Sequence, residues 1–150
     1  YSVAKTAPNK YGDTFERTLV QISMQESYLG EVLVGDLKPR RPLTSASLGW
    51  FHFRIETVRH LQALYPEEIG WLSQKSDQWI AESLKSNEEL NLVLAILNVH
   101  RLSESKLTQR SKFKIISMWN GGVNNPSYVK AVNKHQETVL YLISNNFYSE

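Results

Sequence analysis

Apolar residues recur at helical spacing along most of this chain. The first clear stripe consists of residues separated by four, three and four positions, namely Phe15, Leu19, Ile22 and Glu26. Residues at these spacings share one face of an α-helix. Asp13 and Thr14 are capping residues for its start, and Gly30 is a stop signal for its end. The pattern therefore predicts a helix between these signals.

The same periodicity predicts five further helical segments. They cover residues 55–65, 67–84, 90–101, 106–119 and 127–147. Pro66 marks the break between the first two. In the segment 67–84 the inward-facing positions are Trp71, Leu72, Trp79, Ile80 and Leu84. The next segment carries Leu90, Val93, Leu94, Leu97 and Arg101, and the last carries Val129, Val132, Val139, Leu140 and Ile143.

Two connections stand out between these segments. Residues 31–49 contain two glycines, two prolines and several Ser and Thr residues, which predicts a long irregular stretch. Loops of this length in compact domains are more often functional than neutral. The stretch "NGGVNNP" at 120–126 predicts a sharp turn. Since the chain shows no alternating strand pattern and no internal repeat, we expect a mainly α protein in which residues 1–150 form one domain with one core.

Composition narrows the class of protein. No apolar run approaches the roughly 18 residues of a membrane-spanning helix, and the longest, "LNLVLAIL", covers residues 90–97. The chain has no Cys, which excludes disulfide scaffolds, zinc-thiolate sites and thiol nucleophiles. Its four histidines lack the short spacings of a zinc site: His52, His60, His100 and His135. We therefore expect no metal and no cofactor.

The charge pattern is mild. A net charge of +2 would favour binding to a polyanion such as nucleic acid or an anionic cell-wall polymer. The compact basic cluster "KPRR" at 38–41 is interpreted either as a solvated loop or as a phosphate or substrate contact. No predicted helix carries the Lys and Arg stripe of a nucleic-acid-binding domain, so we expect no nucleic-acid partner.

Glu26 raises a chemical question, because it follows Ile22 by four residues and Leu19 by seven on the face that these two bury. Burial raises the pKa of a carboxyl group by disfavouring its charged form. A proton held near neutral pH is what a general acid needs. Glu26 is therefore either the solvated edge of an ordinary helix or an acid held in a cleft.

Four segments in a fixed order bear on this choice. "QES" at 25–27 is followed by "SASLGWFHFRIETVRHL" at 45–61, "NEELNLVLAIL" at 87–97 and "SMWNGGVNNPSYVKAV" at 117–132. This order resembles the lytic transglycosylases, the lysozyme-like family that cleaves the glycan strands of peptidoglycan, and more distantly goose-type lysozyme. The resemblance spans about residues 12 to 133. It implies a lysozyme-like helical fold with a substrate cleft.

The resemblance also implies site residues. Glu26 matches the catalytic glutamate of the family, and Ser27 matches the serine beside it. Further matches are Ser47 and Gly49 in the loop, Thr57, the pair Asn91-Leu92, Asn120 with Gly121 and Gly122, and Tyr128-Val129 with Val132. The chain departs from the family pattern at Phe51 for Met, His52 for Gln, Ile55 for Pro and Trp119 for Tyr.

The departures leave alternatives open for two residues. His52 is interpreted either as a titrating group near the substrate or as a structural hydrogen-bonding residue of the groove wall. Trp119 is interpreted either as a stacking platform for a sugar ring or as a core aromatic. In "WNGGVNNP", Asn120 offers an amide suited to hydroxyl and N-acetyl groups, and the glycines allow close approach of a ligand. The alternative there is an ordinary turn between helices.

The resemblance implies cleavage of the β-1,4 bond between N-acetylmuramic acid and N-acetylglucosamine, with Glu26 as acid and then base and a 1,6-anhydro product. The alternative is a hydrolase, in which Glu31 or Asp36 would act as a second carboxylate. A further alternative is an inactive glycan-binding or virion structural module. The implied partners are peptidoglycan strands, with or without a secretion, injection or cell-wall assembly, and the implied location is the periplasm or cell wall.

Overall fold

The computed structural model of this protein describes residues 14–104, 112–120, 125–138 and 141. Within them it is mainly helical, which confirms the predicted α class. The chain divides into two compact units, one formed by Tyr1–Gln25 with Val99–Glu150 and the other by Glu26–Asn98. The expectation that residues 1–150 form a single domain stays a prediction. The two units are described separately below.

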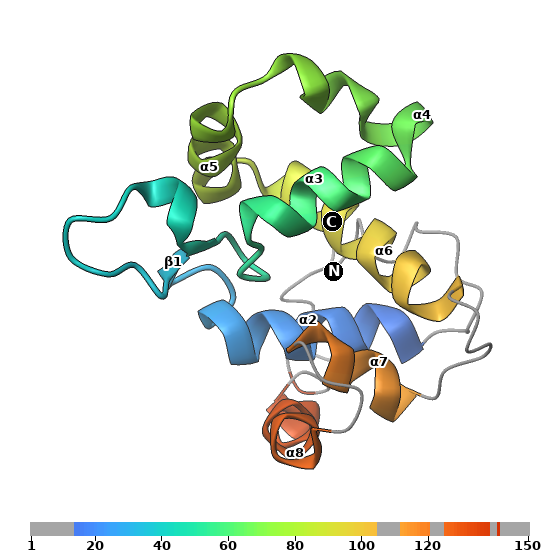
Figure 1. Ribbon diagram of the computed structural model, residues 1–150. Helices are drawn as coiled ribbons and strands as arrows, with labels where there is room; N and C mark the ends of the chain where they lie inside the picture. Colours follow the sequence, from blue (N-terminus) through green and yellow to red (C-terminus); the bar gives the residue numbers. More distant parts are fainter. Residues whose placement is uncertain (1–13, 105–111, 121–124, 139–140, 142–150) are drawn as a thin grey trace. The chain divides into compact units, whose positions relative to one another are not determined.

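The first unit contains most of α2 (Thr14–Ser27), the end of α6 (Glu88–Glu104), α7 (Lys112–Trp119) and α8 (Pro126–Asn133). Helix α8 lies next to α2 (Figure 1), where the side-chain amide of Gln21 donates to the carbonyl of Val132 at 3.3 Å. The buried apolar residues of the first unit include Leu19, Val20, Ile22, Ile115, Ile116, Val129 and Val132. The apolar stripe predicted for the first helix is therefore buried at Leu19 and Ile22.

The second unit contains α3 (Ile55–Leu64), α4 (Pro66–Ile69), η2 (Gly70–Gln74), α5 (Asp77–Ser86) and the first part of α6. It also holds a short antiparallel pair, β1 (Val34–Gly35) and β2 (Ser47–Leu48), with η1 (Leu43–Ser45) between them. In Figure 1 the loop between β1 and η1 extends away from α3 and α5. Fully buried apolar side chains of this unit include Leu48, Val58, Leu61, Leu72, Ile80, Leu84 and Leu94.

Arg59 fixes the connection between η2 and α5. Its guanidinium donates to the carboxylate of Asp77 at 2.8 Å and to the carbonyls of Leu72 and Lys75 at 2.8 and 2.7 Å. An arginine fork can satisfy several acceptors in one plane. The segment that follows α4 is therefore anchored on α3.

Several predicted boundaries are confirmed and others are wrong. The helix predicted over 55–65 is confirmed by α3, and the stripe from Leu90 lies on α6. The single helix predicted over 67–84 is wrong, because the chain breaks into α4, η2 and α5. The hydroxyl of Ser76 accepts from the backbone N–H of Trp79 and so starts a new helix. The inward position predicted for Trp71 is also wrong, since this side chain is 49% exposed.

Helix ends account for the remaining differences. Helix α2 ends at Ser27, three residues before the predicted stop, because Tyr28, Leu29 and Gly30 all take positive φ angles. Helix α8 ends at Asn133 and a turn follows at 134–135, so the single helix predicted over 127–147 is interrupted. Helical residues resume at 136–138 and at 141, and residues 139–140 and 142–147 lie outside the described part of the chain. Helix α7 covers the second half of the helix predicted over 106–119, and residues 106–111 are not described. Within the described residues, no helix is both long and apolar enough to span a membrane.

Candidate functional site

The candidate site is built on a tight turn in the second unit. Leu48 and Phe53 exchange two backbone hydrogen bonds of 2.8 Å each, so the four residues between them form the loop of a hairpin. Gly49 has a φ of +86° and His52 a φ of +50°. A Cβ atom on Gly49 would overlap the side-chain oxygen of Asn91 and lie 2.8 Å from the carbonyl oxygen of Leu84. The turn therefore requires glycine here for both its angle and its space.

Two buried polar side chains hold the turn, one bonded to the backbone N–H of Trp50 and the other to its carbonyl. Asn91 has no exposed surface, and its Oδ1 accepts from the backbone N–H of Trp50 at 3.0 Å. Its Nδ2 donates to the carbonyls of Leu84 and Asn87, each at 2.9 Å. Ser27 is also fully buried, and its hydroxyl donates to the carbonyl of Trp50 at 2.7 Å. The end of α2 and the start of α6 thus both fix Trp50.

This geometry assigns Ser27 a structural position. Its hydroxyl also accepts from the backbone N–H of Gly30 at 2.9 Å, so it joins the end of α2 to the Trp50 turn. Because the side chain is buried, Ser27 supports the turn from within; direct contact with a substrate stays a prediction.

The turn presents His52 to Glu26. The Nε2 atom of His52 lies 2.8 Å from the carbonyl oxygen of Val32. A carbonyl oxygen can only accept, so Nε2 carries the hydrogen, and Nδ1 of the neutral ring has a free lone pair. That Nδ1 lies 3.7 Å from Oε2 of Glu26. The hydrogen bond to Val32 therefore selects the tautomer that faces the carboxyl group with an acceptor.

Gly35 forms the wall behind the imidazole. A Cβ atom at this position would lie 2.8 Å from Cε1 and 3.0 Å from Nδ1 of His52. The backbone pairing of Gly35 with Ser47 in β1 and β2 holds this wall in place. Any larger residue at 35 would push the ring away from its present position.

Glu26 is mostly removed from water. Its side chain is 18% exposed and that of His52 is 14% exposed. Glu26 lies in the last turn of α2, where the helix dipole disfavours a negative charge. The carboxyl group of Glu26 and the imidazole of His52 lie 3.7 Å apart, and both side chains are mostly shielded from water. This is an arrangement suited to proton transfer.

The two other candidate carboxylates have different surroundings. Asp36 is 67% exposed at its side chain, and its Oδ2 accepts from the hydroxyl of Ser47 at 3.0 Å and from Arg54 at 3.2 Å. Glu31 is exposed. The predicted Ser47 is thus buried against Asp36, and Asp36 is engaged by a cation.

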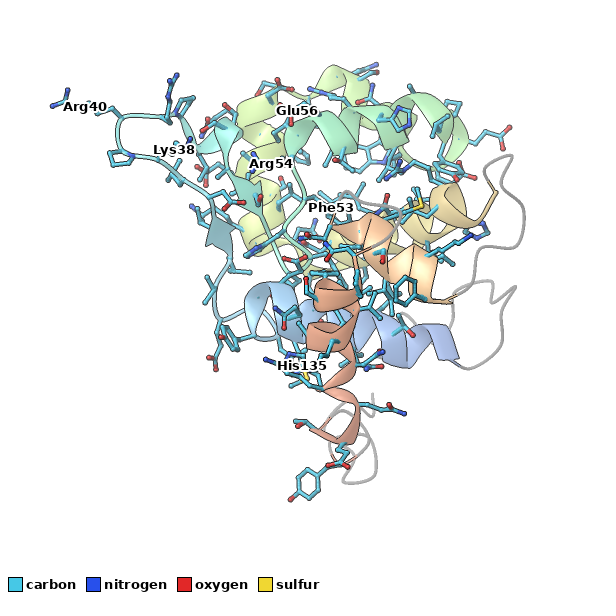
Figure 2. The ribbon with its side chains drawn as sticks, turned by 60° about the horizontal axis from the view of Figure 1, so that its bottom comes forward. Lys38, Arg40, Phe53, Arg54, Glu56 and His135 are labelled. Atoms are coloured by element: carbon cyan, nitrogen blue, oxygen red, sulfur yellow. The ribbon has the colours of Figure 1, made fainter. Side chains whose placement is uncertain are left out.

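The basic cluster lies on the loop between β1 and η1. Figure 2 shows Arg40 at the outer end of this loop and Lys38 on the same loop. All four residues of "KPRR" are exposed. Their placement agrees with the interpretation as a solvated loop.

The remaining predicted site residues belong to the first unit. Trp119 is half-buried and Asn120 is exposed, with its Oδ1 accepting from Nδ2 of Asn125 at 3.1 Å. Asn125 also caps α8 by accepting from the backbone N–H of Tyr128, whose side chain is buried. Gly121 lies outside the described residues, as does its neighbour at 122. The roles predicted for these residues stay predictions.

Sequence analysis did not single out three residues that shape the pair of Glu26 and His52. These are Val32, which fixes the tautomer, Gly35, which packs on the ring, and Trp50, whose peptide groups are held from both sides. Only Gly35 left a signal, as a glycine within the irregular stretch 31–49. A backbone carbonyl such as that of Val32 leaves no trace in the sequence.

Comparisons with protein-family models, with curated proteins and with solved structures found no match to this chain.

Proposed function

We propose that this protein cleaves the glycan strands of peptidoglycan as a lytic transglycosylase, with Glu26 as its acid and base. The observation that carries the proposal is the position of Glu26. Its carboxyl group is mostly buried and faces the lone pair of an imidazole whose tautomer is fixed. The four ordered segments that resemble lytic transglycosylases supply the substrate class. A lysozyme-like arrangement with a substrate cleft, in the periplasm or cell wall, belongs to the same proposal.

The proposed reaction needs one carboxyl group. Protonated Glu26 donates its proton to the glycosidic oxygen as the bond from that oxygen to the muramic acid C1 breaks, through an oxocarbenium-like transition state. The carboxylate then takes the proton of the 6-hydroxyl of the same muramic acid, and that oxygen bonds to C1. The products are a free 4-hydroxyl on N-acetylglucosamine and a 1,6-anhydro ring. Glu26 ends protonated, ready for the next cycle.

His52 is a positioning residue in this proposal. Its Nδ1 lies 3.7 Å from the Glu26 carboxyl group, and the orientation of the ring is set by the carbonyl of Val32 and the backbone of Gly35. The imidazole is therefore held on two sides before any substrate arrives. Such preorganisation lowers the cost of reaching the reactive geometry.

The surroundings of Asp36 favour a transglycosylase over the alternative hydrolase. A hydrolase of the inverting kind uses a second carboxylate to activate water on the opposite face of the sugar. Asp36 is instead bound to Arg54 and Ser47. A carboxylate oxygen that already accepts from two donors has less capacity left to accept from a water molecule. Glu31 stays the alternative second carboxylate.

Digestion of purified peptidoglycan, followed by mass spectrometry of the muropeptides, tests the proposal. The wild-type protein should give products lighter by one water than hydrated fragments, and the Glu26→Gln variant should give none. Glu31→Gln, a matched change at an exposed carboxyl group, should retain cleavage. Hydrated ends that disappear in Glu31→Gln would establish the hydrolase. Cleavage by Glu26→Gln at the wild-type rate would refute the role of Glu26, and inactivity of a folded wild type would favour a glycan-binding module.

A further inference from the structure

The unit Glu26–Asn98 has a second surface feature, which does not include Glu26 or His52. Where η2 and the start of α6 meet, the surface forms a hollow of about 240 Å³. Its apolar lining comes from Ile69, Leu90 and Val93, and Trp71 forms part of its wall. This volume is below the roughly 300 Å³ at which pockets for drug-sized ligands begin, so the hollow suits a single ring.

Trp71 is an exposed aromatic surface that is held in place. Its side chain is 49% exposed although it belongs to the hollow. Its ring meets the ring of Trp79 edge-on, at 5.8 Å between centroids and 83° between planes. The Nζ atom of Lys75 lies 4.8 Å from the centroid of the Trp79 ring on which Trp71 packs. A large indole that keeps a fixed orientation while exposed is suited to stacking against a ligand.

The polar groups around the indole include both donors and acceptors. Glu68 and Glu89 are exposed carboxylates in the lining and can accept hydrogen bonds. Asn87 contributes an amide whose Oδ1 already accepts from the backbone N–H of Leu90 at 3.0 Å. Its Nδ2 is the part of that amide left to donate to a ligand. A ligand that matches this set must itself offer hydroxyl donors and a carbonyl acceptor.

From this set of groups we infer that the hollow is a second glycan-binding site, which takes one N-acetylated hexosamine ring. The C–H face of the sugar stacks on Trp71, its hydroxyls donate to Glu68 and Glu89, and its acetamido carbonyl accepts from Asn87. The acetamido methyl packs on the apolar lining. An organic ammonium would satisfy the two carboxylates and the indole, but it has no acceptor for Asn87. The choice of an N-acetylated sugar among sugars rests on the proposed function, whereas the hollow itself does not include Glu26.

Nuclear magnetic resonance of the indole N–H groups tests the site. The full chain with Glu26→Gln, which prevents cleavage of the probe, is titrated with the tetrasaccharide of N-acetylglucosamine. The Trp71 resonance, assigned as the one absent from Trp71→Phe, should shift and saturate. The tetrasaccharide of glucose, which has no acetamido group, should bind about tenfold more weakly, as expected for one lost hydrogen bond.

Asn87→Asp is the matched variant. Aspartate keeps an oxygen that accepts from Leu90, so it preserves the start of α6, but it replaces the donor Nδ2 by an acceptor. It should abolish the preference for the N-acetylated tetrasaccharide while the other indole resonances keep their positions. An unchanged preference would overturn the assignment of the acetamido contact.

The remaining outcomes separate this inference from the proposed function. If peptidoglycan is cleaved by the wild type but the Trp71 resonance does not shift, the second site is refuted and the proposed function stands. If the resonance shifts but no cleavage occurs, the second site stands without the proposed function. Tighter binding of n-butylammonium than of the sugar at Trp71 would overturn the inference in favour of a cation site.

Discussion

Replacing Gly49 by alanine should destabilise the protein, and the same replacement at Gly70 should not. At Gly49 the left-handed φ of +86° costs an L-residue about 1–2 kcal/mol. The new Cβ atom would also overlap Asn91 Oδ1, with the carbonyl of Leu84 only 2.8 Å away on its other side, so the Asn91 amide must move. A buried polar group left without its partner costs about 1–3 kcal/mol. The two terms together predict a loss of about 2–5 kcal/mol.

Gly70 is the matched control. Its φ of −59° and ψ of −26° are ordinary helical angles, and a Cβ atom there would lie 3.7 Å from Cβ of Pro66, at normal contact distance. Alanine at such a position removes freedom from the unfolded chain and stabilises a protein by about 0.4–1 kcal/mol. The two variants therefore carry the same chemical change with opposite expected signs.

Urea unfolding measures both variants. Because the chain divides into two compact units, circular dichroism and tryptophan fluorescence should be recorded in parallel, so that separate transitions are detected. For a chain of this size, thermal unfolding of Gly49→Ala should shift downward by about 2–4 °C per kcal/mol. If Gly49→Ala proves as stable as Gly70→Ala, the account of the Trp50 turn is refuted, including the part assigned to Asn91.

Three further predictions concern the histidines. Gly35→Ala should displace the imidazole of His52 and lower peptidoglycan cleavage by about tenfold. Circular dichroism should show that the fold is retained, since Gly35 does not need a positive φ. A wild-type cleavage rate would contradict the packing of Gly35 against the ring. His52→Gln should keep more activity than His52→Leu in the same assay, because glutamine retains one donor and one acceptor; equal rates would show that the hydrogen bonds of this side chain do not matter. The pKa of His135 is lowered by burial and by the charge of Lys134, so the unfolded state binds more protons than the folded state. The free energy of unfolding should therefore fall as the pH drops below the ordinary histidine pKa of 6.5. Urea unfolding at pH 8 and pH 5 should show this loss of stability, and His135→Gln should make the loss smaller.

The fold was predictable where a helix is marked in the sequence by its capping residues and by apolar residues at helical spacing. Ile55 to Tyr65 could be read as a helix because Pro66 ends the pattern, and α3 agrees. The apolar periodicity continues from Trp71 through Leu84, so it gave no indication that the helix is interrupted. The interruption depends on Ser76, which caps the start of α5. The strands β1 and β2 could not be predicted, because two residues are too few to show an alternation of apolar and polar positions.

The candidate site was only partly predictable. Glu26 could be singled out from its place on the apolar stripe and from the ordered segments around it. Its neighbour His52, with Nδ1 3.7 Å from Oε2 of Glu26, lies on a turn in which Asn91 of α6 accepts from the backbone N–H of Trp50. Such a contact joins residues that are far apart in the sequence, and periodicity describes local structure alone.

The departure at His52 also has a chemical explanation in this geometry. The motif that the segment resembles has glutamine there, and a glutamine side chain offers one NH₂ donor group and one carbonyl acceptor. His52 has its Nε2–H directed to the carbonyl of Val32 and its Nδ1 lone pair directed to Glu26, so it offers one donor and one acceptor in the same way. Histidine at position 52 therefore offers one donor and one acceptor, as the glutamine of the similar motif would.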